Sequence, residues 1–179
     1  MGFLLFPGSA VALPARVPPP EAPVLPTYAV TLTAYNAVPE QTDSEPLVTA
    51  SGAYSNPEVV AARSQDLAAE LPFGTIIEID GTDAAKKSCG YDIVKPLIGY
   101  RVIADTMHAR YTDRIDILFS TKSNYTLAGG SVKNAGIVLG ICSGAAIRVV
   151  GQVAINRIPE TQAELAAFVR GSTKELAFK

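Results

Sequence analysis

Residues 100–119 read Tyr100-Arg-Val-Ile-Ala-Asp105-Thr-Met-His-Ala-Arg110-Tyr-Thr-Asp-Arg-Ile115-Asp-Ile-Leu-Phe119, and this stretch decides the fold. Apolar, β-branched runs on both sides of a polar segment predict two strands, 99–105 and 114–119, joined by a loop. Because side chains alternate across a strand, Ile115 and Ile117 share one face and Asp116 stands on the other. Strands disfavour aspartate, so Asp116 is the first candidate for a functional side chain.

The same sequence pattern continues on both sides of this stretch, with short β-branched or alternating runs separated by Gly, Pro, Asn and Asp. Further strands are predicted at 28–35, 58–62, 74–79, 135–141 and 145–155. Short helical segments are expected at 64–71 and 120–128, a C-terminal helix from 159 to a stop at Gly171, and an inserted surface loop at 81–96. Many short strands with few helices favour a mainly β fold closed into a barrel.

The bulk composition supports one domain with tails. The 179 residues are 48% apolar and 18% charged, which suffices for one packed core. We expect a truncated signal-like segment and Pro-rich linker at 1–27, the barrel at 28–156, and a helical appendage or tail at 157–179. A formal charge of -2 offers no basic surface for nucleic acid, so none is expected as a partner.

The N-terminal residues are either a truncated secretory signal, which we expect and which predicts export, or an apolar tail with no targeting role. An apolar stretch at 3–6 and small residues at 10 and 12 resemble the end of a secretory signal without its basic leader. Six of the thirteen prolines fall in 13–26, which favours an extended linker. The stretch is too short and too interrupted by proline to span a membrane. We expect an exported monomer in the periplasm, cell wall or extracellular space, with no stable membrane span.

Cys89 and Cys142 lack the paired spacing of a zinc or redox motif. Two interpretations are open: a single disulfide in an exported protein, or two buried free thiols that act as small hydrophobes.

The chemistry of a mid-strand carboxyl also leaves two interpretations open. A buried carboxylate costs several kcal/mol unless it is paired, hydrogen-bonded or protonated. If Asp116 is protonated near neutral pH it can act as a general acid, with Asp105 as the second carboxylate of a pair. Alternatively, Asp105 caps its loop and Asp116 forms an ion pair with Arg114 or Arg101.

His108 is the only histidine, and no second histidine or cysteine lies near it. It therefore predicts a hydrogen bond within its loop rather than a metal ligand. The spacing of Asp105, Asp113 and Asp116 is not that of a calcium loop. We expect no metal and no cofactor.

Six short motifs follow one another along the chain. They are Val30-Thr-Leu-Thr-Ala-Tyr35, Thr49-Ala-Ser-Gly52, Val59-Val-Ala61, Leu71-Pro-Phe-Gly-Thr75, Ala104-Asp-Thr106 and Arg114-Ile-Asp-Ile-Leu-Phe119. Over roughly residues 30–150, their order and spacing resemble the three-aspartate (3D) domain family, which is similar to the catalytic barrel of membrane-bound lytic transglycosylase A. The resemblance implies a six-stranded double-psi β-barrel with a glycan groove, and its three namesake aspartates map onto Asp66, Asp105 and Asp116.

The activity implied by the resemblance is lytic cleavage of the β-1,4 bond between N-acetylmuramic acid and N-acetylglucosamine in peptidoglycan, with a 1,6-anhydro product. Asp116 would act as acid and then as base, while Asp105 and Asp66 complete the catalytic set. The expected substrate-binding residues are Tyr35, Thr49, Ser51, Thr106 and Arg114. The chain departs from the family pattern in having Met107-His108 where many members have Gly-Gly.

The main alternative is a cell-envelope barrel that binds peptidoglycan without cutting it. Tyr54 and Tyr111 are further candidates for the groove wall, or they are ordinary half-buried barrel tyrosines. An aspartic protease is excluded because the paired Asp-Thr-Gly loops are absent.

Overall fold

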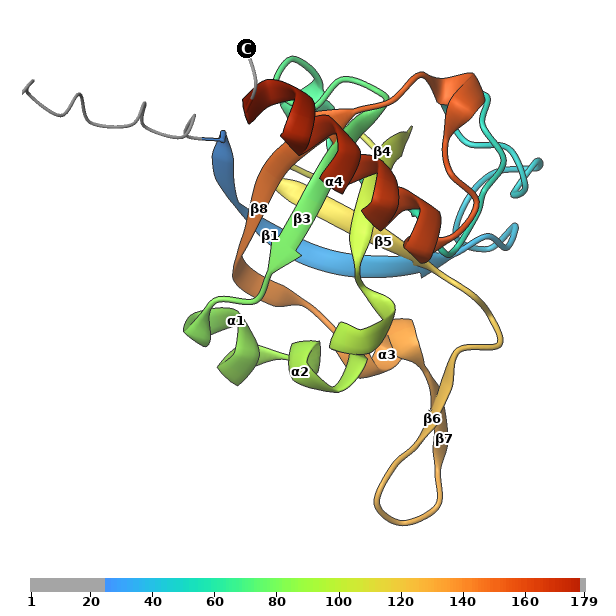
Figure 1. Cartoon of the computed structure of the whole chain (residues 1–179). Helices are drawn as coiled ribbons and strands as arrows, with labels where there is room; N and C mark the ends of the chain where they lie inside the picture. Colours follow the sequence, from blue (N-terminus) through green and yellow to red (C-terminus); the bar gives the residue numbers. More distant parts are fainter. Residues whose placement is uncertain (1–24, 178–179) are drawn as a thin grey trace, which may run out of the picture.

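Six strands close into a barrel in the computed structural model, which describes residues 25–177 (Figure 1). The strands are β1 (Thr27–Asn36), β2 (Val60–Arg63), β3 (Thr75–Asp80), β4 (Tyr100–Thr106), β5 (Arg114–Phe119) and β8 (Cys142–Gln152), in the closed order β1-β5-β2-β4-β3-β8. The predicted mainly β, six-stranded barrel is confirmed. The predicted signal-like segment and most of the linker lie outside the described residues.

The strand order requires two crossovers. β1 pairs with β5, and β2 with β4, in parallel, whereas the other neighbours are antiparallel. Because β5 lies between β1 and β2, the β1–β2 connection passes β5. The β4–β5 connection passes β2 in the same way. This pair of crossovers is the arrangement expected of a double-psi barrel.

The predicted alternation of β5 is confirmed. Ile115 and Ile117 are fully buried in one apolar cluster, while Leu118 is buried in a second cluster on the opposite face. Asp116 shares the face of Leu118. The strand that carries Asp116 is therefore packed on both sides, which fixes the position of its side chains.

The segment 81–96 is not the surface loop that its polar composition predicted. It folds into α1 (Asp83–Ser88), α2 (Tyr91–Val94) and a 3₁₀ turn, η2 (Lys95–Leu97), at one end of the barrel (Figure 1). Tyr91 and Val94 are buried in the main core, and the Tyr91 hydroxyl donates to the Ile79 carbonyl at 3.0 Å. A few apolar side chains among many polar ones therefore close this end of the barrel.

Cys89 and Cys142 form a disulfide across 53 residues of sequence. It joins the segment after α1 to the first residue of β8. This finding decides between the two interpretations of the cysteines, and a bridge closing a loop of this length contributes about 2–4 kcal/mol to stability.

The predictions for 120–128 and 135–141 were wrong. The first region carries β6 (Asn124–Thr126), which pairs with β7 (Val132–Asn134) in a hairpin. The second forms α3 (Ala135–Leu139), where the Asn134 side chain caps the helix by accepting from the Gly136 amide, and Gly140 ends it at φ 68. A short apolar run fits a buried strand and a buried helix equally well, and the caps decide between them.

The C-terminal helix α4 (Gln162–Ala177) packs on the barrel and is not an appendage (Figure 1). Leu165 and Val169 are buried against the cluster that contains Leu118. The expected stop at Gly171 was also wrong, because the helix continues through it; a glycine lowers helix stability without ending a helix that packs.

Two 3₁₀ turns complete the fold, η1 (Gln65–Ala68) and η3 (Ile155–Arg157). η1 lies within the predicted helical segment at 64–71, with Ser64 at the N-cap position. Among the described helices, none is both long and apolar enough to cross a membrane.

Candidate functional site

Asp105 and Asp116 stand opposite the same residue of the strand between them. Ala62 of β2 is opposite Asp105 on one side and opposite Asp116 on the other. Beyond β5, Thr33 of β1 is also opposite Asp116. Residues in register on neighbouring strands point to the same face. These four residues therefore form one row across β4, β2, β5 and β1, which we call the aspartate row.

An irregularity in the β2–β4 pairing makes this row possible. The register steps from Ala61 opposite Ile103 to Ala62 opposite Asp105, skipping Ala104. In a regular strand Asp105 would share the face of Ile103, which is fully buried in the main core. The extra residue turns Asp105 to the face of Asp116, as β-bulges near functional sites commonly do.

Asp116 is largely buried and accepts a hydrogen bond from the Thr33 hydroxyl at 2.8 Å. The pKa of this carboxyl is raised to about 6, chiefly by burial and to a smaller extent by the charge of Asp105. The Thr33 hydrogen bond and the charge of Arg114 act in the opposite direction. The side chain can therefore hold or release a proton close to neutral pH.

The alternative ion pair of Asp116 with an arginine is not formed. Within residues 25–177 the one ion pair joins Arg148 and Glu78. Arg101 is buried and donates to backbone carbonyls, including that of Leu118 at 3.1 Å. Arg114 lies over the Tyr111 ring, 4.9 Å from its centroid. Arg114 thus acts on Asp116 through its charge and not through a contact.

Three donors converge on the Asp105 carboxyl. The Tyr35 hydroxyl donates to Oδ2 at 2.8 Å, and the amides of Ala50 and Thr106 donate to Oδ1 at 2.9 Å each. Burial, and then the charge of Asp105, raise the pKa of Tyr35 well above its ordinary value, so the phenol remains a donor. Asp105 is thus held by three hydrogen bonds, whereas Asp116 accepts one, from the Thr33 hydroxyl.

The loop 47–54 brings two more predicted residues to the end of β4. The Ser51 amide donates to the Ala104 carbonyl at 3.1 Å, which places the loop beside Asp105. Thr49 is buried, and its hydroxyl contacts Ser51 Oγ at 3.0 Å and the Ala53 carbonyl at 3.1 Å. Thr49 therefore shapes the loop, while Ser51 is half-buried beside the aspartate row.

Asp66 does not join the aspartate row. It is exposed and accepts hydrogen bonds from the Ser64 hydroxyl and from the Asp113 amide, the latter at 2.9 Å. These bonds lower the pKa of its carboxyl. Asp113 has a left-handed backbone, with φ 51. Asp66 thus holds the turn that leads into β5 and so helps to position Asp116.

The remaining predicted residues lie around this turn. Thr106 donates weakly to the Arg63 carbonyl at 3.4 Å, and the Tyr111 ring is covered by both Arg110 and Arg114. Tyr54, by contrast, is 66% exposed. Of the two extra tyrosines, Tyr54 is the more exposed.

His108 forms the predicted hydrogen bond within its loop, because its Nδ1 accepts from the Arg110 amide at 3.2 Å. In the part of the chain that the structure describes, no group of three or more His, Cys, Asp or Glu side chains could hold a metal ion.

The sequence did not indicate Thr33 or the Ala50 amide. Thr33 is one of three threonines in β1, and only the pairing of β1 with β5 places it against Asp116. The Ala50 amide has no side-chain signal at all.

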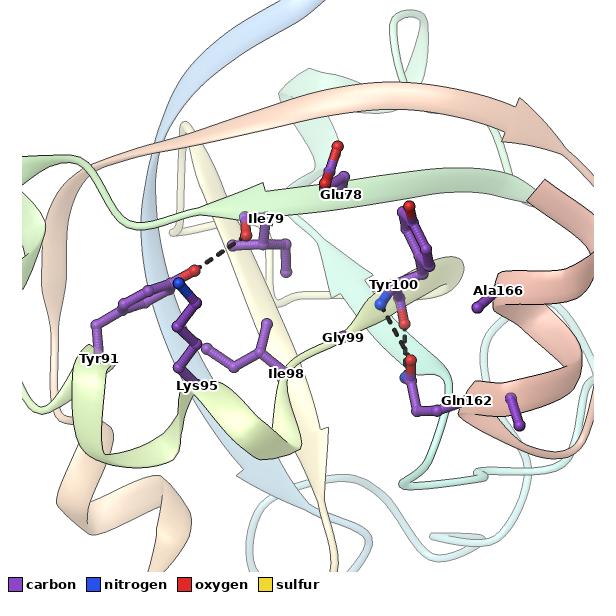
Figure 2. A pocket seen from close by; sticks show the side chains of 10 residues that line it. Glu78, Ile79, Tyr91, Lys95, Ile98, Gly99, Tyr100, Gln162 and Ala166 are labelled. Atoms are coloured by element: carbon purple, nitrogen blue, oxygen red, sulfur yellow. Dashed lines mark hydrogen bonds between the residues drawn. The ribbon is translucent and has the colours of Figure 1, made fainter. Parts of the chain in front are cut away.

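A pocket of about 510 Å³ lies elsewhere, between the start of β4, β3 and α4 (Figure 2). It is lined by Glu78, Ile79, Tyr91, Lys95, Ile98, Gly99, Tyr100, Gln162, Ala163 and Ala166, none of which was predicted as a site residue. The Gln162 side chain is bonded to both backbone groups of Tyr100, so it ties α4 to the barrel edge. This pocket is formed by the unexpected packing of α4, at the opposite end of β4 from Asp105.

The chemistry that the aspartate row offers is a proton donor and acceptor with a pKa near 6, beside a carboxylate held by three donors. No family model and no curated protein matches the sequence. The residues of the row therefore carry the functional argument by themselves.

Proposed function

We propose that the protein is an exported lytic transglycosylase that acts on the glycan strand of peptidoglycan, with Asp116 as its acid and then its base. The observation that supports this most strongly is the aspartate row. It sets a buried carboxyl that can carry a proton near neutral pH next to a second carboxyl that is anchored by Tyr35, Ala50 and Thr106. One movable proton beside one fixed negative charge is what this reaction requires.

The reaction begins with the transfer of the Asp116 proton to the bridging oxygen. The bond from C1 of the muramic acid residue to that oxygen breaks, and the glucosamine residue leaves with a free 4-hydroxyl. Positive charge develops on the muramic acid ring, as in other glycoside cleavages. The carboxylate of Asp116 then takes the proton of the sugar's own 6-hydroxyl while O6 bonds to C1. No water is consumed, and Asp116 ends the cycle protonated.

The neighbours of Asp116 have distinct roles in this proposal. The negative charge of Asp105 faces the developing positive charge and adds to the effect of burial on the pKa of Asp116, so a larger share of the molecules carries the proton near neutral pH. Asp66 positions the turn before β5. Ser51, Thr106 and Arg114 surround the row and would contact the sugar hydroxyls or the muramic acid lactyl carboxylate.

The disulfide agrees with export. Disulfides persist mainly in oxidising compartments outside the cytosol, and Cys89 and Cys142 are bridged. We therefore place the reaction in the periplasm, the cell wall or the extracellular space.

The direct test incubates the purified protein with peptidoglycan and analyses the products by mass spectrometry. We expect 1,6-anhydromuropeptides from the parent protein and none from Asp116→Asn. Asp80→Asn is the matched control, because Asp80 is an exposed aspartate at the end of β3. Activity equal to the parent in Asp116→Asn, or products with reducing ends, would contradict the proposal.

A non-catalytic glycan-binding barrel predicts a different result in the same experiment. The folded parent protein would then sediment with peptidoglycan, and no soluble anhydro product would form at any pH between 4 and 8. Loss of sedimentation in Asp105→Asn, with no turnover, would assign the aspartate row to binding.

A further inference from the structure

The elements at one end of the barrel are α1, α2, η2, the β6–β7 hairpin and α3 (Figure 1). We call this region, residues 81–99 and 120–141, the lysine end. β4 begins at the lysine end and reaches Asp105 at the far end of the barrel. β5 begins near Asp105 and runs back to the lysine end, where it finishes at Phe119. The lysine end and the aspartate row are thus at opposite ends of the barrel.

Charge is divided between these two ends. The lysine end has two acidic residues, Asp83 and Asp92, and a formal charge of +3. Its five basic residues are Lys86, Lys87, Lys95, Lys122 and Lys133. The other residues that the structure describes have a formal charge of -6. None of the five lysines takes part in an ion pair within residues 25–177.

Large apolar side chains are exposed at the same end. Five of the ten such side chains in the described part of the chain lie here: Ile93, Leu127, Val132, Ile137 and Ile141. Ile137, on α3, is 68% exposed, and Ile141, two residues after α3 ends, is 59% exposed. Exposed apolar side chains scattered singly are ordinary, but a group of them among lysines indicates an interaction surface.

The β6–β7 hairpin has the pattern of a segment that enters a lipid interface. Residues 123–132 contain no charged side chain, and a lysine flanks them on each side: Lys122 precedes β6 and Lys133 lies on β7. Leu127 stands at the tip, where its amide donates to the Ser131 carbonyl at 2.9 Å. An apolar tip flanked by lysines can enter the headgroup region while the lysines remain among the headgroups.

We propose that the lysine end docks peripherally on an anionic lipid bilayer. Lysines gain energy near anionic headgroups, and the exposed isoleucines and Leu127 gain energy by leaving water. The acidic remainder of the molecule is repelled by the same surface, so one orientation is favoured. In that orientation the aspartate row faces away from the bilayer.

Charge also argues against the two other occupants of this surface. Two copies of the protein that met through it would bring together two faces of charge +3. A nucleic acid would be expected to contact arginines, and the lysine end contains none. An anionic bilayer satisfies both the charge and the apolar side chains.

Vesicle flotation tests the proposal. The full-length protein is mixed with vesicles of 70% phosphatidylcholine and 30% phosphatidylglycerol, and separately with pure phosphatidylcholine. We expect flotation with the anionic vesicles at low salt, little with the neutral ones, and weaker binding as salt is raised.

Two paired variants and two matched controls locate the surface. Lys122→Gln with Lys133→Gln should weaken partitioning roughly 25-fold, at about fivefold for each lysine. Leu127→Ser with Ile137→Ser should also weaken it, and this loss should persist at high salt. Arg157→Gln with Arg170→Gln is the charge control and Leu47→Ser with Val48→Ser the apolar control; all four residues are exposed outside the lysine end, and neither pair should change binding.

Equal flotation with neutral and anionic vesicles, or none with either at low salt, overturns the proposal. So does a loss in the control variants as large as that in the lysine-end variants. A concentration-dependent dimer that Ile137→Ser abolishes in sedimentation velocity would assign the surface to self-association instead. The assay contains no glycan, so its outcome is independent of the proposed transglycosylase activity.

Discussion

The Tyr35 hydroxyl donates to the Asp105 carboxyl at 2.8 Å. Tyr35 is on β1 and Asp105 is on β4, and β5 and β2 lie between these two strands in the barrel. This bond joins the first strand of the chain to the end of β4 across the aspartate row. Tyr35 is buried, and no other side chain donates to Asp105 among the described residues. The bond therefore links the closure of the barrel to the geometry of the site.

Replacing Tyr35 with phenylalanine should lower both the stability of the protein and the proposed activity. The Asp105 carboxyl loses its side-chain donor, which should cost about 1–3 kcal/mol of unfolding free energy, measured by urea denaturation. The proposed glycan cleavage should fall about tenfold, because Asp105 is less firmly placed. Tyr28→Phe is the matched control on the same strand, and it should change neither quantity; a Tyr35→Phe protein as stable as the parent would show that the bond is unimportant.

Replacing Asp116 with asparagine should stabilise the protein at pH 7. Burial raises the pKa of Asp116 from an ordinary 3.8 to about 6, so the ionised side chain destabilises the folded state by about 3 kcal/mol above that pH. Below about pH 4 the carboxyl is protonated in both folded and unfolded chains, and the penalty disappears. Asparagine keeps an acceptor for Thr33 and carries no charge at any pH.

The stability difference between Asp116→Asn and the parent should therefore be near zero at pH 4 and grow as the pH rises through 4 to 6. Urea denaturation at several pH values measures it directly. A difference that does not depend on pH would mean that Asp116 is not buried as a titrating acid. Asp80→Asn, on an exposed side chain, should show little difference at any pH.

The sequence predicted the position of Asp116 well, because period-two alternation in β5 leaves no other face for it. It could not predict how Asp105 faces the same way. That depends on a bulge at Ala61–Ala62, a feature of pairing between distant strands that leaves no local signature. Thr33 and the Ala50 amide were missed for the same reason, since their roles come from contacts far along the chain.

The errors in the fold prediction also have physical causes. The run Ala135–Leu139 is apolar enough for a strand, but the Asn134 cap and the turn at Gly140 favour a helix. The segment 81–99 is polar on average, and the few residues that matter, such as Tyr91 and Val94, are buried singly. Average composition predicts exposure poorly where a segment closes the end of a barrel.

Arg114 should tune the acid without touching it. Its charge lowers the pKa of Asp116, while its guanidinium lies over the Tyr111 ring. Arg114→Gln should therefore raise the pKa of Asp116 above its parent value, measured from the pH dependence of the carboxyl carbon chemical shift in NMR. If Asp116 is the acid, the alkaline limb of the activity profile should move upward with it.

Arg110→Gln provides the control for this prediction. Arg110 covers the same Tyr111 ring, 4.7 Å from its centroid, so its removal disturbs the turn in a similar way. We expect it to leave the Asp116 titration unchanged. Arg114→Lys should keep the parent titration, because the charge is retained; equal shifts in all three variants would point to a structural effect of the turn.

Alanine substitutions at two glycines with positive φ distinguish the cost of backbone strain from the cost of a steric clash. Gly74 precedes β3 at φ 91, and a Cβ there would lie 2.2 Å from the Val153 carbonyl oxygen, whereas Gly52 has φ 82 and nothing within 4 Å of an added Cβ. Gly52→Ala should cost about 1 kcal/mol of unfolding free energy, from strain alone. Gly74→Ala should cost at least about 3 kcal/mol, because the backbone around Val153 must also move.

Gly74 also links β4 to the residue that follows β8, since its amide donates to the Ile103 carbonyl at 2.8 Å and its carbonyl accepts from the Val153 amide at 2.9 Å. Movement at this point would disturb β4 just before Asp105. Gly74→Ala should therefore lower the proposed glycan cleavage even at temperatures where the protein remains folded, whereas Gly52→Ala should not lower it by more than its small loss of stability explains. Thermal unfolding followed by circular dichroism, together with the muropeptide assay, measures both effects, and similar losses in the two variants would show that the contact with Val153 is relieved without cost.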